Sequence, residues 1–241
     1  MIIMVLLKIS FNFFLFFLSN FSVGQETHFN KLYPILNEYV KNFPKEFRKI
    51  PEDRRYRLNE IIYYLEEQEE NNAPWQLIFI GAHQSSISQM AQVWSKAAAY
   101  YFGFPNFQSF SCGIRPNEIS VNSIVALEKA GFIIYKSFID GIDVYRIKYS
   151  HNLKPIVAFP KKMGHVKNPY SNFMAVVVEE NTNINIHNIK GSYHRLFLNY
   201  NDPVGYEGSG LEGKVYEESC RKVAVEMFYV FSQLRKRMNK K

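Results

Sequence analysis

The chain has 241 residues, 47% of them apolar and 21% charged, with a formal net charge of +7 at pH 7. This composition places it among ordinary globular proteins with one sizeable core. Two cysteines are too few for a disulfide framework, and spacing alone leaves open whether Cys112 and Cys220 form a bridge. The basic residues are mixed with acidic ones, which argues against nucleic acid as a partner.

The first 24 residues have the pattern of a secretory signal peptide. Lys8 stands between two apolar runs rich in Leu and Phe, and small residues at Ser22 and Gly24 predict cleavage before Gln25. An uncleaved anchor is the alternative, although Lys8 interrupts the apolar run that a spanning helix needs. We therefore expect an exported protein, periplasmic or secreted, that touches a membrane only if this segment is retained.

Residues 25–74 are predicted to form an N-terminal helical extension. Apolar side chains recur there at helical spacing in two runs separated by Pro44. The first run is Leu32, Ile35, Leu36, Tyr39, Val40 and Phe43, and the second is Leu58, Ile61, Ile62 and Leu65. Two amphipathic helices are expected to precede the main domain, which spans residues 75–238.

The main domain opens with a short apolar run over residues 76–80. Such a run without alternation is typical of a strand buried on both faces of a parallel sheet. A helix follows almost at once, with Ser88 as its predicted cap and Gly103 at its end. A second strand is predicted over residues 107–112.

The later elements continue the alternation of strands and helices. They are a helix from Ser120 to Gly131, a hairpin of residues 144–149 and 155–159, a strand over 175–178 and a helix over 217–238. This order predicts an α/β fold, a three-layer α/β/α sandwich around a central, mostly parallel, four-stranded sheet.

The loop between the first strand and the first helix is the expected site, because such sheets bind ligands outside the carboxyl ends of their strands. Its sequence is Gly-Ala-His-Gln-Ser-Ser-Ile-Ser over residues 81–88. Followed by Gln89-Met90-Ala91, it resembles the phosphate loop of the low-molecular-weight tyrosine phosphatases and the related arsenate reductases. Members of that family read Cys-x(5)-Arg-Ser at this place.

The resemblance continues downstream in the family's order, over residues 75–232. It is carried by residues 92–94, 97–101, 110–113, 126–132, 155–159, 201–203 and 226–232. The N-terminal helical extension also suits a longer bacterial branch of these tyrosine phosphatases.

The resemblance implies that the catalytic groups are lost. In the family, a thiolate attacks the phosphate or arsenate and an arginine clamps the oxyanion. The cysteine position falls on Gly81 and the arginine position on Ile87. The general acid, an Asp before Pro, is matched by Asp202, which would be vestigial. Resolving cysteines of the reductase branch would fall on Glu179 and Ile186, so redox function is not expected either.

Backbone N–H groups at a helix N-terminus attract anions without any cysteine. The expected anion-binding loop consists of Ala82, His83, Gln84, Ser85, Ser86 and Ser88. The sequence thus predicts an exported pseudo-phosphatase. Its expected partner is either an oxyanion (phosphate, arsenate or sulfate), bound weakly, or an unknown protein. No cofactor is expected, and no metal, because the histidines lack paired ligand spacing.

The alternative is an active hydrolase of phosphate monoesters or phosphotyrosine with a non-standard nucleophile. Ser85 with His83 and Asp202 is one candidate set, since a serine needs an adjacent base. The thiol of Cys112 is another. Against these stand simpler interpretations, in which His83 satisfies hydrogen bonds of the loop and Cys112 packs as a small buried residue.

Overall fold

The computed structural model describes residues 31–82, 86–179, 187 and 189–240. The predicted signal peptide, three loop residues (His83, Gln84 and Ser85) and Ile186 lie outside these described residues. Among the helices that are described, none is both long enough and apolar enough to cross a membrane.

The centre of the fold is a four-stranded sheet in the order β2-β1-β6-β7, with every neighbouring pair parallel. The strands are β1 (Gln76–Gly81), β2 (Gln108–Gly113), β6 (Phe173–Glu179) and β7 (Ser192–Tyr200). This confirms the predicted α/β fold class with its parallel four-stranded sheet. Strand β7 was not predicted, because its first four residues are polar or exposed and hide the apolar alternation.

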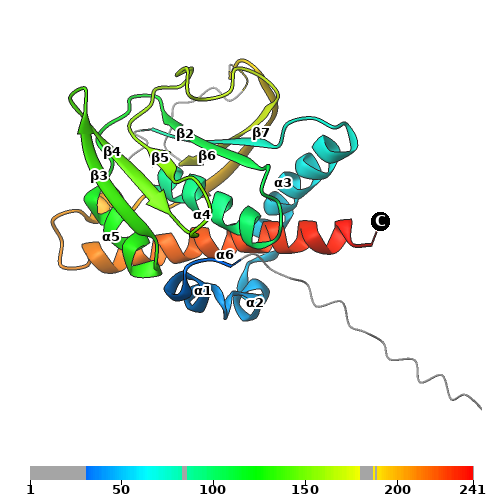
Figure 1. The fold of residues 1–241 in the computed structure, drawn as a ribbon, viewed down its shortest axis with the longest axis horizontal. Helices are drawn as coiled ribbons and strands as arrows, with labels where there is room; N and C mark the ends of the chain where they lie inside the picture. The colour runs from blue at the N-terminus through cyan, green and yellow to red at the C-terminus, as the bar shows by residue number, and fades with distance from the viewer. Residues whose placement is uncertain (1–30, 83–85, 180–186, 188, 241) are drawn as a thin grey trace, which may run out of the picture.

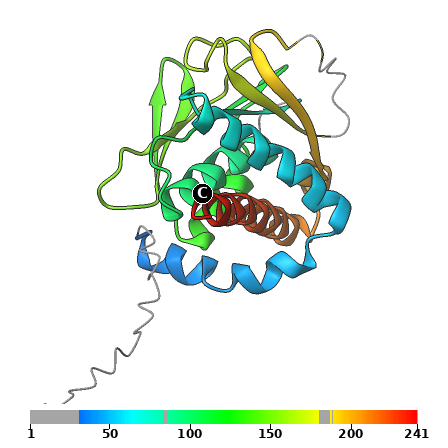
Figure 2. The ribbon, with the colours of Figure 1, turned by 90° about the vertical axis from the view of Figure 1, so that its right-hand side faces the viewer.

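Helices pack against one face of this sheet (Figures 1 and 2). They include α4 (Ile87–Tyr101), α5 (Val121–Ala130) and the long α6 (Glu212–Met238). Side chains such as Phe79 and Val176 join Trp94 of α4 and Phe228 of α6 in the main core. The predicted ends of α5 are confirmed, with Ser120 at its N-cap position and Gly131 at its C-cap.

The opposite face of the sheet carries a smaller apolar cluster. It consists of Ile78, Ile80, Cys112, Phe173, Ala175, Val177 and Ile189. Ile189 lies outside the helices and strands, so in the described part of the chain this face is covered by loop residues rather than by helices.

A second sheet is antiparallel and has three strands, β3 (Ile133–Ile139), β4 (Ile142–Lys148) and β5 (Ile156–Ala158). The predicted hairpin is the β4–β5 pair. Strand β3 was missed, although Asp140-Gly141 is a strong two-residue hairpin signal, and both residues have positive φ, 49° and 82°.

The described part of the N-terminal extension forms helices between residues 34 and 70, and these contribute to the main core. It consists of α1 (Pro34–Val40), α2 (Phe43–Glu46), a 3₁₀ turn (Phe47–Lys49) and α3 (Glu52–Glu70). Phe43 packs edge-on against Phe228 of α6, with ring centroids 5.3 Å apart.

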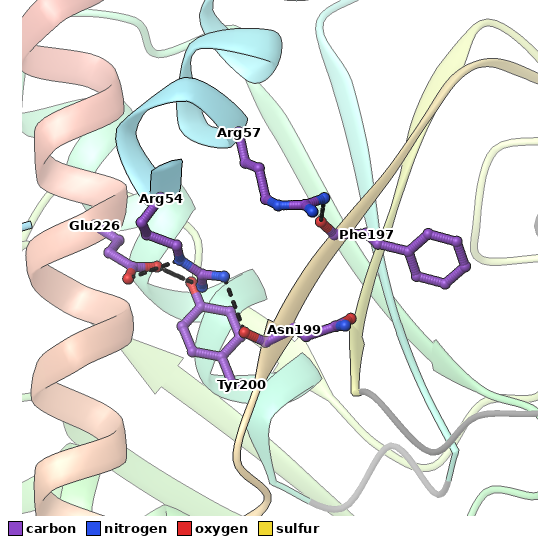
Figure 3. A network of polar contacts seen from close by, with 6 residues as sticks. All are labelled: Arg54, Arg57, Phe197, Asn199, Tyr200 and Glu226. Atoms are coloured by element: carbon purple, nitrogen blue, oxygen red, sulfur yellow. Dashed lines mark hydrogen bonds and ion pairs between the residues drawn. The ribbon is translucent and has the colours of Figure 1, made fainter. Parts of the chain in front are cut away.

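A partly buried polar network also ties α3 to β7 and α6 (Figure 3). Arg54 donates to both carboxylate oxygens of Glu226, at 3.0 and 2.8 Å, and to the Asn199 carbonyl at 2.9 Å. Its guanidinium lies 4.3 Å from the ring centroid of Tyr200, whose hydroxyl donates to Glu226 at 2.5 Å. The extension is therefore fastened to the sheet as well as packed on the helices.

Candidate functional site

The loop after β1 lies where the sequence analysis expected a site, at the carboxyl end of a central strand. Gly81 is the last residue of β1 and pairs with Gly113 of β2. Helix α4 begins at Ile87, with Ser86 at the N-cap position, so Ser88 lies inside the first turn. The prediction of Ser88 as the cap was wrong by two residues. No side chain caps α4, because the Ser86 hydroxyl bonds elsewhere.

The carboxylate of Glu179 occupies this loop. Glu179 ends β6, the strand beside β1, and is only 6% exposed. Its Oε2 accepts a hydrogen bond of 2.6 Å from the backbone N–H of Ala82, the first residue of the loop. A Cβ added at Gly81 would overlap its Oε1 and would lie 3.0 Å from its Cδ. The carboxylate therefore takes the space that a side chain at position 81 would need.

Sequence reasoning named Glu179 only as the occupant of a lost cysteine position and missed its place in the loop. Ala82 and Glu179 are 97 residues apart, so no local pattern connects them. The sequence held one signal for this contact: Gly81 lacks a side chain, and the acidic Glu179 ends a later strand. Only the sheet order β1-β6 brings the two together.

Ile87, at the position of the family's arginine, is fully buried in the main core. It supplies no charge to the loop. Because the surrounding core is apolar, an arginine introduced here would have to turn its guanidinium out of the core to avoid the cost of burying a charge.

Asp202 lies against the loop. Its Oδ1 accepts a hydrogen bond of 2.7 Å from the Ser86 hydroxyl and another of 3.2 Å from the Val204 N–H. The second bond caps a 3₁₀ turn, Pro203–Tyr206. Asp202 therefore has a structural role that needs no catalysis.

Two side chains in the first turn of α4 are buried with unsatisfied polar atoms. The Ser88 hydroxyl and both amide atoms of Gln89 have no hydrogen-bond partner in the described part of the chain. Both residues are at most 2% exposed. Ser88 stands where the family motif has its serine. Buried polar groups of this kind are normally satisfied by water or by a ligand.

The two cysteines are free and lie on opposite faces of the sheet. Cys112 belongs to the smaller apolar cluster, and burial raises its pKa to about 12. Cys220 lies in the main core, accepts a hydrogen bond of 3.2 Å from the Trp94 indole, and has its pKa raised to about 12 by burial. Neither thiol is ionised near neutral pH, so neither has the character of a nucleophile.

The described residues contain no group of three or more His, Cys, Asp or Glu side chains that could hold a metal ion. The described polar side chains at the loop are two carboxylates, those of Glu179 and Asp202, together with hydroxyls and an amide. Such a set can accept and donate hydrogen bonds.

No protein-family model and no curated protein matches the chain. Solved structures do match. An arsenate reductase in the phosphate-binding state is 14% identical, with a TM-score of 0.44 over 66% of this chain and 98% of that chain. A low-molecular-weight protein tyrosine phosphatase from T. tengcongensis is 13% identical, with a TM-score of 0.44 over 66% and 98%.

The YwlE arginine phosphatase from Geobacillus stearothermophilus is 13% identical, with a TM-score of 0.46 over 69% of this chain and 97% of that chain. These three structures are thus an arsenate reductase, a low-molecular-weight protein tyrosine phosphatase and an arginine phosphatase. The fold class rests on this chain's own strand order and registers.

Proposed function

We propose that the chain is an exported, non-catalytic relative of the low-molecular-weight tyrosine phosphatases and arsenate reductases, with its phosphate loop closed by its own Glu179. The observation that carries this proposal is the buried Glu179 carboxylate, which accepts the Ala82 N–H and fills the space beside Gly81.

The absence of a nucleophile supports the lack of catalysis. Loss of the nucleophile in a covalent mechanism costs on the order of 10⁶-fold in rate. Gly81 offers no reactive group, and Ile87 offers no clamp for an oxyanion. Asp202 alone cannot restore turnover, because a general acid only assists a step that something else must begin.

The position of Glu179 also lowers the affinity expected of the loop for anions. Its carboxylate accepts the hydrogen bond from a loop N–H that a bound oxyanion would otherwise accept. An incoming phosphate would meet a negative charge within a few ångströms, which disfavours its binding. We therefore expect oxyanion binding in the loop to be weak while the Glu179 carboxylate occupies it, and the function that remains is binding of another partner outside the cell.

The alternative, a hydrolase with another nucleophile, draws on the position of Asp202 beside the loop. The nearest described hydroxyl, that of Ser86, donates to Asp202 at 2.7 Å. Ser86 is fully buried, however, so a substrate could not reach it without a rearrangement. Cys112 is protonated near neutral pH because of its raised pKa.

Turnover of para-nitrophenyl phosphate tests the proposal. The unmodified chain is compared with Gly81→Cys/Ile87→Arg and with the same pair combined with Glu179→Ala, and circular dichroism checks the fold of each. We expect no turnover by the unmodified chain and the highest turnover by the triple variant, because Glu179 obstructs a side chain at position 81.

Turnover by the unmodified chain that disappears in Asp202→Ala would overturn the proposal and support the alternative enzyme. The matched control is Asp143→Ala, which removes a carboxylate from β4, away from the loop.

A further inference from the structure

A pocket of about 670 Å³ runs along the outer edge of β2, between α4, β5 and the segment that follows β5. Four of its lining residues are lysines, Lys96, Lys154, Lys161 and Lys167, and none of its described lining residues is Asp or Glu. The described residues of the loop after β1 do not line it. It is therefore a second, positively charged candidate site, and its described lining residues differ from those of the loop that Glu179 closes.

Lys161 is the innermost charge of this pocket, since it is only 3% exposed. Its ammonium nitrogen lies 4.6 Å from the ring centroid of Phe159, another lining residue. Burial lowers the pKa of Lys161 to about 8, against a smaller opposing effect of Cys112. A buried ammonium group in the wall of a pocket is a positive charge that attracts an anion bound there.

Asn168 adds a buried hydrogen-bond acceptor. It is 5% exposed, and its amide nitrogen donates to the Ser111 carbonyl at 3.2 Å, which fixes the orientation of the amide. Its Oδ1 has no hydrogen-bond partner among the described residues. A buried carbonyl oxygen of this kind is normally satisfied by a donor, which a hydroxyl of a ligand or a water can supply.

The remaining walls are largely apolar. They include Phe110, Phe159, Pro155, Ile156 and Val157. Lys96 is held on the wall by the backbone, because its ammonium donates to the carbonyls of Pro105, at 3.1 Å, and Phe107. Lys154 and Lys167 are exposed and lie at the rim. The volume is in the range of pockets that hold small organic ligands.

We propose that this pocket binds an organic anion with a flat apolar body. Lys161 supplies the charge inside the pocket, Lys154 and Lys167 attract the ligand at the rim, and the aromatic and branched side chains cover its apolar part. The recognised chemistry is an acid group, phosphate or carboxylate, attached to a ring. This site is independent of the non-catalytic role proposed for the loop.

Isothermal titration calorimetry with phenyl phosphate as the probe tests this proposal. Inorganic phosphate, which has the charge without the ring, and benzyl alcohol, which has the ring without the charge, are the matched probes. We expect each to bind at least about tenfold more weakly than phenyl phosphate, since each lacks one of the two recognised features.

Lys161→Met removes the inner charge while keeping a long side chain, and we expect it to weaken phenyl phosphate binding about tenfold or more. The control is Lys162→Gln, which removes an exposed neighbouring charge that does not line the pocket and leaves binding unchanged. Lys167→Gln, at the exposed rim, is expected to weaken phenyl phosphate binding by a smaller factor. Because Lys167 is exposed, this variant tests the pocket without changing a buried side chain.

Unchanged binding in both Lys161→Met and Lys167→Gln would overturn the proposal, as would absence of phenyl phosphate binding to the unmodified chain. Glu179→Ala separates the two sites. If that variant binds phenyl phosphate more tightly and the lysine variants do not bind it more weakly, the probe sits in the loop and the pocket proposal fails.

Discussion

Among the residues that the structure describes, two carboxylates are buried, and they sit in different surroundings. Glu226, 3% exposed, is held by the guanidinium of Arg54 and the hydroxyl of Tyr200. Glu179, 6% exposed, accepts a backbone N–H of the loop after β1. The first carboxylate joins three elements of the fold. The second accepts the first N–H of the candidate loop, so its burial bears on the proposed function as well as on stability.

The largest expected effect on stability comes from breaking the ion pair between Arg54 and Glu226. Glu226→Ala leaves the Arg54 guanidinium buried without its carboxylate, and we expect it to destabilise the fold by about 3–5 kcal/mol. Urea unfolding followed by circular dichroism measures the change. A loss below about 1 kcal/mol would contradict the structural role of this pair. Glu218→Ala, on the exposed side of α6, is the matched control.

A side chain at position 81 tests how tightly Glu179 fills the loop. Gly81→Ala is expected to destabilise the fold by about 1–3 kcal/mol, because the new Cβ overlaps the Glu179 carboxylate. Combining it with Glu179→Ala should remove most of that cost, since the obstruction is gone. Chemical denaturation of the unmodified chain, the two single variants and the double variant gives a double-mutant cycle on the free energy of unfolding. Additive effects would show that the two positions do not touch.

A third buried charge gives a pH test. The pKa of Lys161 is lowered to about 8 by burial, so its protonated form is less stable in the folded chain than in the unfolded one. Below pH 8 the full cost is present, and it disappears as the pH rises toward the unfolded value of about 10.4. Relative to that of Lys161→Met, the free energy of unfolding of the unmodified chain should rise by about 2 kcal/mol between pH 8 and pH 10. A pH-independent difference would mean that Lys161 is not desolvated.

The smallest expected effect concerns Asp202. Ser86→Ala removes the 2.7 Å hydrogen bond to Asp202 and should cost about 1 kcal/mol of stability. Because Asp202 also caps the turn Pro203–Tyr206 through the Val204 N–H, Asp202→Ala should cost more than Ser86→Ala. The reverse order in thermal unfolding would show that Asp202 is not a structural residue.

The sequence predicted the elements whose patterns are local. The apolar runs of β1 and β6, the helix between Ser120 and Gly131, and the β4–β5 hairpin are present. Strands β3 and β7 were missed because several of their apolar side chains face solvent or alternate with polar ones. Edge strands of this kind carry a weak signal, since only part of each is buried.

The sequence singled out the loop after β1 and Asp202 as site residues, and in the structure the two meet through the hydrogen bond between Ser86 and Asp202. The contact of Glu179 with the loop could not be predicted from the sequence, because it depends on β6 lying beside β1 in the sheet. The lysine-lined pocket was missed for a similar reason. Its charges come from α4 and from residues after β4 and β5, which no single motif connects.

The central claim is that the Glu179 carboxylate takes the place of an anion in the loop after β1. Calorimetric titration of inorganic phosphate into the unmodified chain and into Glu179→Ala tests it most directly. Our account predicts binding by the variant and at least about tenfold weaker binding by the unmodified chain. Equal binding by the two proteins, or binding by the unmodified chain alone, would contradict it.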